Sequence, residues 1–415
     1  MKQNIPRLLI VGYVWPEPNS SAAGHRMMQL ISIFKEHGWK ITFASSATES
    51  EHAADLQERG IDTQPVEINS SGFDTFLENL QPDVVMFDRF VVEEQFGWRV
   101  AEHCPGALRI LDTEDLHCLR RARRRAILEN RPFSEVDLLE DEVAKREIAS
   151  ILRCDLSLII SEYEMKLLTD HFQVDESLLH YLPFLLNPID QAQVEEWPTF
   201  DDRAHYITMG NFRHPPNRDA VQFLKTEVWP RIRSRQKKAV LHVYGAYPSR
   251  QVTDLHEPRE GFHIKGRTPD ARAVVRSAKV CLAPLRFGAG LKGKLVEAMQ
   301  CGTPSVTTPV GAEGLNGEKE WPGAVAQSSE EIAAAAVRLY TNRSAWEKAQ
   351  LTGLEIVNTR FGKSRFEPAF TDRIQHVREN LEKHRRHNFT GSMLMHHTMA
   401  STRYMSKWIE AKNRM

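Results

Sequence analysis

The sequence predicts an α/β protein made of two doubly wound, Rossmann-like domains in tandem, facing each other across a cleft. The chain has 415 residues, more than a single hydrophobic core usually serves. Short uninterrupted apolar runs alternate with longer helical patterns, which indicates parallel strands covered by helices on both faces. This alternation restarts in the second half, after a polar segment (186–203) that contains Pro188 and Pro198.

In the first half, residues 25–38 predict a helix. Met28, Ile31 and Phe34 recur there at helical spacing, and Gly38 stands where a C-terminal cap glycine belongs. The first domain is expected over 1–190, with a linker over 191–203. The strands expected in this domain are 7–13, 40–46, 83–88, 108–113 and 155–160.

The second domain is expected over 204–365, followed by a helix and a basic tail over 366–415. Thr268 followed by Pro269 predicts the N-cap and first position of a helix in this domain. The strands expected here are 205–210, 240–245, 261–266, 278–285 and 304–309.

Composition excludes several classes of protein. Lys plus Arg (54) nearly equals Asp plus Glu (55), so the whole chain gives no general argument for nucleic-acid binding. The five cysteines are scattered and form no CxxC pair, which favours reduced thiols in a cytoplasmic protein. The apolar start suits a first strand better than a signal peptide, and no run of 18 uncharged apolar residues predicts a membrane span.

The stretch "GAGLKGKLVE" (288–297) carries the clearest functional signal. It follows a predicted strand and opens a helix, so it lies at the carboxyl edge of a sheet, where ligands bind. Glycines allow close backbone approach, and the helix N-terminus favours an anion such as a phosphate or pyrophosphate.

Three interpretations of this loop compete. Gly288, Gly290 and Gly293 match the dinucleotide pattern G-x-G-x-x-G, although the loop comes too late in its domain and no acidic residue ends the next strand. The stretch also nearly matches a P-loop, but Leu295 replaces the hydroxyl residue that would bind magnesium. In the third interpretation, the loop binds a nucleoside diphosphate. The phosphates would lie on the loop, and the ribose would lie on the carboxylate of Glu297, one helical turn after Lys294.

The segment "GAGLKGKLVEAMQCGTPSVTTPVGAEGL" resembles the donor site of glycosyltransferases with the GT-B fold, in the family called group 1 or family 4. Three further segments agree in order: the loop and helix from 14 to 30, residues 111–120, and residues 210–232. The resemblance covers residues from about 7 to about 370. It implies two Rossmann-like domains and a C-terminal helix that crosses back to the first domain.

The resemblance also implies roles for individual residues. Glu297 would bind the donor ribose; otherwise it would be an exposed helical residue paired with Lys292 or Lys294. A second glutamate common in the family is replaced by Ala289, and the family's Arg and Lys pair by Arg213 and His214. The predicted donor-binding residues are Gly24, Gly210, Arg213, Gly266, Arg267, Gly288, Ala289, Gly290, Lys292, Lys294 and Glu297.

Asp115 and His117 are the catalytic candidates. They lie with Asp112 and Glu114 at the end of a predicted strand facing the cleft. Ionisable groups close together at the cleft are expected to have shifted pKa values. They can act as a base or stabilise positive charge at an anomeric carbon. The alternative is a structural cap of the following helix.

Two basic segments leave alternatives open. Arginines 120, 121, 123, 124 and 125 form either an exposed basic helix or a patch for an acidic acceptor or lipid head group. The tail 371–415 has nine Lys or Arg and four Asp or Glu. Its first part, 373–387, is expected to be helical, and the remainder, 389–415, is either a partly disordered extension or an amphipathic segment in peripheral contact with the inner face of a membrane.

Taken together, these residues and the resemblance predict a glycosyltransferase of the hexosyl or a related type. It would move a sugar from a nucleotide-diphosphate donor to a glycan or lipid-linked acceptor in cell-surface polysaccharide synthesis. No metal or other cofactor is expected, and family resemblance favours retention of configuration. The alternatives are a non-catalytic nucleotide-sugar-binding subunit of a glycan-assembly complex and a GT-B nucleotide-sugar epimerase.

Overall fold

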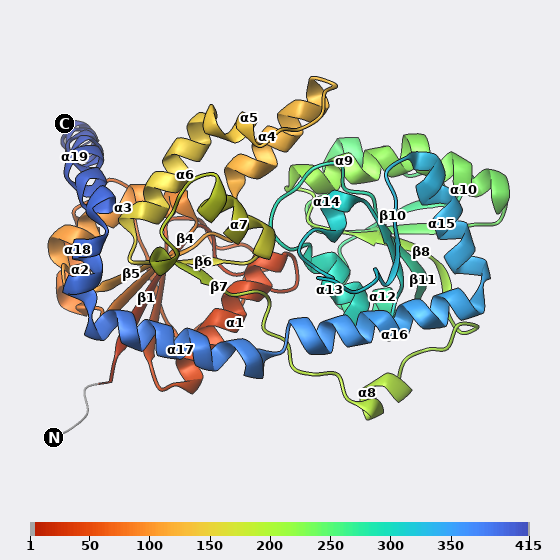
Figure 1. Ribbon diagram of the computed structural model, residues 1–415, viewed down its shortest axis with the longest axis horizontal. Helices are drawn as coiled ribbons and strands as arrows, with labels where there is room; N and C mark the ends of the chain where they lie inside the picture. Colours follow the sequence, from red (N-terminus) through yellow and green to blue (C-terminus); the bar gives the residue numbers. More distant parts are fainter. Residues whose placement is uncertain (1–4, 414–415) are drawn as a thin grey trace.

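A computed structural model describes residues 5–413, which form two α/β domains, each built on its own parallel sheet (Figure 1). The strands of the first sheet are β1 (Arg7–Gly12), β2 (Lys40–Ser45), β3 (Asp62–Pro65), β4 (Val84–Asp88), β5 (Leu108–Asp112), β6 (Leu156–Ile159) and β7 (Leu179–Tyr181). Their order across the sheet is β3-β2-β1-β4-β5-β6-β7, and every pairing is parallel.

Helices cover both faces of the first sheet. Leu9 and Val11 of β1 face one hydrophobic core and Leu8 and Ile10 face the other, which is why this strand is continuously apolar from Leu8 to Val11. The helices of this domain are α1 (Ala22–Glu36), α2 (Gly72–Leu80), α3 (Phe90–His103), α4 (His117–Leu128), α5 (Val136–Leu139), α6 (Glu142–Arg153), α7 (Glu162–Asp170) and the 3₁₀ turn η1 (Glu176–Leu178).

The second domain repeats this plan. Its strands are β8 (Ala204–Met209), β9 (Leu241–Tyr244), β10 (Phe262–Gly266), β11 (Ala278–Ala283), β12 (Ser305–Thr307) and β13 (Gly323–Val325), in the order β10-β9-β8-β11-β12-β13. Its helical segments are α9 (Pro215–Phe223), η2 (Leu224–Val228), α10 (Trp229–Arg235), α11 (Arg250–Thr253), η3 (Pro258–Glu260), α12 (Ala271–Ser277), α13 (Gly293–Gln300), α14 (Pro309–Ala312), α15 (Ser329–Thr341) and α16 (Arg343–Arg360). A short helix, α8 (Gln191–Glu195), lies in the segment between the sheets.

The end of the chain returns to the first domain, as predicted. Helix α16 packs on α13 of the second domain, whereas α17 (Lys363–Glu379) buries Phe370, Ile374 and Val377 against the first. Figure 1 shows the two helices running in sequence along one side of both domains. The last helices, α18 (Leu381–His387) and α19 (Phe389–Asn413), lie on the first domain.

All ten predicted strands are present, and the predicted fold class is confirmed. Gly38 has a φ of +75°, the left-handed conformation of a helix-ending glycine, directly after the C-cap His37. One local prediction is wrong: α12 is capped by Asp270, whose carboxylate accepts the Ala273 amide at 2.9 Å, and not by Thr268. The carboxylate competes better than a hydroxyl for the free amides of the first turn.

No helix within residues 5–413 is long and apolar enough to cross a membrane.

Candidate functional site

A cavity of about 1210 Å³ lies between the two domains. The first domain contributes the loop and helix start around Ser20, the β4–α3 junction and the β5–α4 loop. The second contributes the loops that follow β8, β10 and β11. The carboxyl edges of the two sheets therefore face each other, which is the arrangement expected for a ligand site in doubly wound folds.

The glycine loop connects β11 to α13 and forms one wall of this cavity. Gly290 has a φ of +61°, and an added Cβ would lie 2.9 Å from Cβ of Asp115. The Gly290 amide donates to Glu164 at 2.8 Å, and the Gly288 carbonyl accepts from Arg123 at 2.9 Å. Both partners belong to the first domain, so the loop is held in place across the cleft.

Two lysines, Lys292 at the end of this loop and Lys294 in the first turn of α13, have pKa values below their usual range. Burial lowers the pKa of Lys292 and of Lys294 to about 8. The Lys292 ammonium donates to the Gly290 carbonyl at 2.7 Å, and the Lys294 ammonium to the Asn217 side chain at 2.6 Å. An anion bound in the cavity would be attracted by both ammonium groups and by the N-terminus of α13.

Glu297 faces the same cavity from the second turn of α13. Among the residues that the structure describes, it forms no ion pair with Lys292 or Lys294. The ammonium groups of these lysines donate instead to Gly290 and Asn217. Burial raises the pKa of Glu297 against the opposing effect of Arg272. The carboxyl group is thus available to a ligand, and the helical ion pair considered for it does not form.

Asp115 and His117 lie on the opposite wall. Asp115 is 3.1 Å from Arg120 and 3.4 Å from the His117 ring. Burial opposes ionisation of Asp115, but nearby positive charge, above all Arg120, outweighs it, so the pKa of Asp115 lies below its usual value. Burial lowers the pKa of His117 to about 3, which leaves a neutral imidazole beside a carboxylate at neutral pH.

A second group of acids lies behind this pair. Asp112 forms a buried ion pair with Arg26 at 3.1 Å, at the end of β5. Burial, Asp112 and Asp88 raise the pKa of Glu114 well above its usual range. Glu114 has a φ of +62°, an uncommon conformation for a non-glycine residue, and it lines the cavity. Its protonated carboxyl group can donate a hydrogen bond into the site.

The structure places almost all the predicted site residues around one space. Gly266 is the exception: it ends β10 and does not line the cavity, although its neighbour Arg267 does. The predicted residues that line the cavity are Gly24, Asp115, His117, Gly210, Arg213, Arg267, Gly288, Ala289, Gly290, Lys292, Lys294 and Glu297.

Gly24 and Gly210 also have evident packing roles. A Cβ on Gly24 would lie 2.5 Å from the Glu17 backbone, and one on Gly210 would lie 2.6 Å from the Asn217 side chain. The guanidinium of Arg213 lies 3.6 Å from the centroid of the Tyr247 ring and is exposed at the cavity. Arg213 is therefore positioned to meet an anion from the solvent side.

Some arginines of helix α4 are exposed to solvent, and others form contacts at the cleft. Arg121 and Arg124 are exposed, as the spacing predicted. Arg120 contacts Asp115 and the His214 ring, and Arg123 pairs with Glu313 of the second domain. Part of the basic run therefore connects the domains.

Sequence reasoning missed Glu164, Arg89 and Glu313. Glu164 is buried, its carboxylate accepts the Leu116 and Gly290 amides, and burial raises its pKa to about 8. Arg89 lines the cavity with a φ of +74°. Each of the three residues lies in an ordinary helix or loop. Their roles become visible only from contacts between segments that are distant in the sequence.

Within residues 5–413, no group of three or more His, Cys, Asp or Glu side chains is arranged to hold a metal ion.

The sequence of residues 203–342 matches the family described as glycosyl transferases group 1. No curated protein sequence matches the chain significantly. Among solved structures, sucrose-phosphate synthase from Thermosynechococcus elongatus is similar with a TM-score of 0.65 and 13% identity, over 89% of this chain and 99% of that one.

Two other solved structures are similar over nearly the whole chain. HepE of Anabaena, in complex with UDP and glucose, has a TM-score of 0.63 and 12% identity, covering 90% of this chain and all of its own. WaaG, a glycosyltransferase involved in lipopolysaccharide biosynthesis, has a TM-score of 0.59 and 13% identity, covering 89% and 99%. The second domain is thus similar in sequence to the group 1 glycosyltransferases, and the whole chain has the GT-B fold of these structures.

Proposed function

We propose that the protein transfers a sugar from a nucleoside-diphosphate donor to an acceptor, with the donor on the second domain and the acceptor on the first. One observation carries this proposal. The glycine loop, Lys294 and Glu297 face Asp115 across a single interdomain cavity. A loop that offers amides and cations to a diphosphate thus lies opposite a carboxylate that can stabilise a developing positive charge.

On the donor side, Lys292, Lys294 and the first turn of α13 would hold the diphosphate, with Arg213 at the solvent edge. Glu297 would bind the ribose hydroxyls one turn further along. Lys294 already lies 2.6 Å from Asn217 at the start of α9, so it is held beside the cavity before any ligand enters. Such prior positioning lowers the entropic cost of binding.

In the transfer step, the bond between the anomeric carbon and the diphosphate oxygen breaks, and the acceptor oxygen forms the new bond. Negative charge grows on the departing diphosphate, next to the lysines, and positive charge grows on the sugar. The ionised Asp115 would stabilise the sugar. The neutral His117, with its pKa of about 3, would orient Asp115 and is poorly suited to carry a proton.

The acceptor proton would leave with the diphosphate, a course compatible with retention of anomeric configuration. We propose a hexosyl or related transfer that needs no divalent cation, because the loop supplies the compensating positive charge. Activity that survives chelation by EDTA would agree with this, and activity restored only by magnesium or manganese would contradict it.

The acceptor is proposed to be a glycan or a lipid-linked sugar in cell-surface polysaccharide synthesis, in the cytoplasm. Support comes from WaaG, which is involved in lipopolysaccharide biosynthesis, and from five free, buried thiols, which suit a reducing compartment. The cavity volume of about 1210 Å³ also exceeds that of most small-ligand sites, which suits a donor and an acceptor bound together.

One observation favours a second candidate, a non-catalytic subunit that binds a nucleotide sugar. Ala289, a buried residue whose side chain has no hydrogen-bonding group, stands where the family often has a glutamate. Such a subunit would bind the donor without releasing its nucleotide.

The test is release of nucleoside diphosphate from a panel of UDP-, GDP-, ADP- and dTDP-sugars, with and without glycan acceptors. Release stimulated by an acceptor, and abolished in Asp115→Asn, supports the transferase. Tight donor binding with no release by any acceptor favours the subunit. An isomerised donor formed with no acceptor present would indicate an epimerase.

A further inference from the structure

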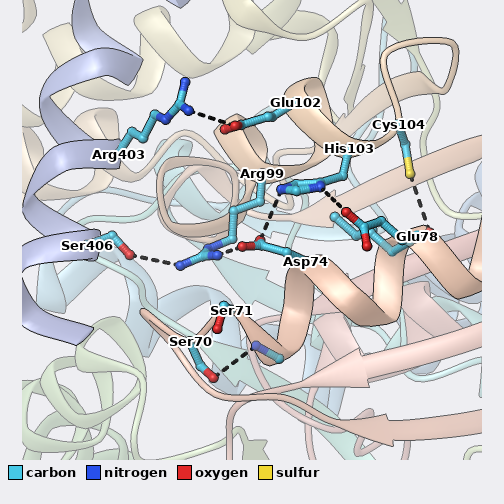
Figure 2. Close-up of polar contacts among 12 residues, drawn as sticks. Ser70, Ser71, Asp74, Glu78, Arg99, Glu102, His103, Cys104, Arg403 and Ser406 are labelled. Carbon is cyan, nitrogen blue, oxygen red and sulfur yellow. Dashed lines mark hydrogen bonds and ion pairs between the residues drawn. The ribbon is translucent and has the colours of Figure 1, made fainter. Parts of the chain in front are cut away.

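Helix α19 is attached to the first domain through the buried Met399 and through several polar contacts. Arg403 pairs with Glu102 at 2.7 Å, and Arg99 donates to the Ser406 hydroxyl at 3.1 Å (Figure 2). Near the end of the helix, the Glu410 carboxylate accepts the Ser71 hydroxyl at 2.7 Å. These contacts fix the helix beside α3 and α6 with one defined face turned inward.

The outward face of α19 carries large apolar side chains. Phe389, Met393, Tyr404 and Trp408 are separated by four, eleven and four residues, so at helical spacing they share an arc of about 100°. Their exposed fractions are 70%, 47%, 69% and 59%. We call these four residues the α19 stripe.

Helix α19 thus exposes large apolar side chains in addition to the apolar Met399 that it buries against its own domain. A helix that only stabilises its own domain would turn its aromatic residues inward and its polar residues toward water. With Met405, α19 holds five of the 14 exposed large hydrophobic residues among those that the structure describes. Clustering of this kind marks a surface that binds something.

Charge indicates what the stripe binds. Lys407 and Lys412 are exposed on the same helix, and Lys412 lies 5.4 Å from the Trp408 ring. Glu410 is the only acidic residue between 389 and 413, and it is engaged with Ser71. Over 381–413 there are six Lys or Arg and two Asp or Glu.

We propose that the α19 stripe, with Lys407 and Lys412, binds the surface of a membrane that contains anionic lipid. Trp and Tyr suit the boundary between head groups and acyl chains, and lysines add attraction to anionic head groups. A second copy of the chain fits less well, because the stripe of one copy would offer no carboxylate to the lysines of the other. This contact goes beyond the proposed transfer and requires neither donor nor acceptor.

The experiment is co-sedimentation of the full chain with vesicles of phosphatidylcholine alone, or mixed with phosphatidylglycerol, in the absence of any nucleotide sugar. The variants are Tyr404→Ser/Trp408→Ser, which shortens the stripe, and Lys407→Gln/Lys412→Gln, which removes the charges. Phe389→Ser/Met393→Ser tests the other end of the stripe if the first pair does not fold. The matched controls are Leu351→Ser and Lys348→Gln, exposed residues of α16 on the other domain.

The wild type should bind the mixed vesicles and bind phosphatidylcholine only weakly. Each stripe pair and the lysine pair should lower the partition coefficient about tenfold or more, and the controls should not change it. No vesicle binding by the wild type, or equal binding by all variants, would overturn the proposal. A dimer in sedimentation velocity that Tyr404→Ser/Trp408→Ser dissociates, without vesicle binding, would assign the stripe to a second copy instead.

Discussion

Arg123 of the first domain and Glu313 of the second form a two-point ion pair across the cleft. The guanidinium nitrogens lie 2.9 and 2.6 Å from the two carboxylate oxygens, and the same arginine donates to the Gly288 carbonyl at 2.9 Å. One side chain therefore joins the arginine-rich helix, the glycine loop and the second domain. The position of the proposed diphosphate site depends on how the domains close.

The first prediction concerns this ion pair. Glu313→Gln leaves Arg123 mostly buried without its charge partner, so the folded protein should lose about 2–4 kcal/mol of stability. The melting temperature should fall, and small-angle scattering should show a larger radius of gyration. Glu320→Gln, in an exposed pair with Lys348, is the control and should change neither quantity. An unchanged melting temperature in Glu313→Gln would contradict the role assigned to the pair.

The second prediction concerns pH. Lys292 and Lys294 have pKa values of about 8, lowered by burial, so both are charged below that pH and lose charge above it. The affinity for a nucleoside diphosphate should therefore fall between pH 7 and pH 9, as measured by calorimetric titration. Lys294→Arg should reduce this dependence because its side chain stays charged. The same slope in both proteins would show that other groups cause it.

The third prediction concerns Gly290. Its φ is +61°, and a Cβ added there would lie only 2.9 Å from Cβ of Asp115, which leaves no room for a side chain. Gly290→Ala should cost about 1–2 kcal/mol from the backbone conformation alone, and more from the contact. It should also lower kcat/KM by displacing the loop. Gly106→Ala, where nothing lies within 4 Å of the added carbon, should change neither stability nor rate.

The fourth prediction separates Asp115 from His117. Asp115→Asn should lower kcat roughly a hundredfold or more while leaving the Kd for the nucleoside diphosphate unchanged, since Asp115 acts on the sugar. Because His117 has a pKa of about 3, it should cause no inflection in kcat between pH 5.5 and 7.5. An inflection in that range that disappears in His117→Gln would show instead that the imidazole carries a proton.

Much of the fold could be predicted because the central strands are buried on both faces. Sequence reasoning missed β3, β7 and β13, which are three or four residues long and lie at the edges of the sheets. An edge strand is covered less completely, so it need not be a continuous apolar run. The residues Asp62–Pro65 of β3 include no large apolar side chain at all.

The candidate site could be predicted where one short segment carries it. The glycine loop and Glu297 are contiguous, and both line the cavity. Glu164 could not be found this way, because it contacts Gly290 from 126 residues away, across the domain boundary. The pairing of Arg123 with Glu313 spans 190 residues and depends on the relative position of two domains, which no local pattern encodes.

The central claim is that the loop from Gly288 to Glu297 holds a nucleoside diphosphate. The most direct measurement is a thermal-shift titration with UDP, GDP, ADP, dTDP and NAD on the wild type, on Glu297→Ala and on the exposed control Glu347→Ala. We predict that one diphosphate raises the melting temperature of the wild type and the control, and that the shift is lost in Glu297→Ala. Stabilisation by NAD with no response to any diphosphate would make the loop a dinucleotide site and contradict the account.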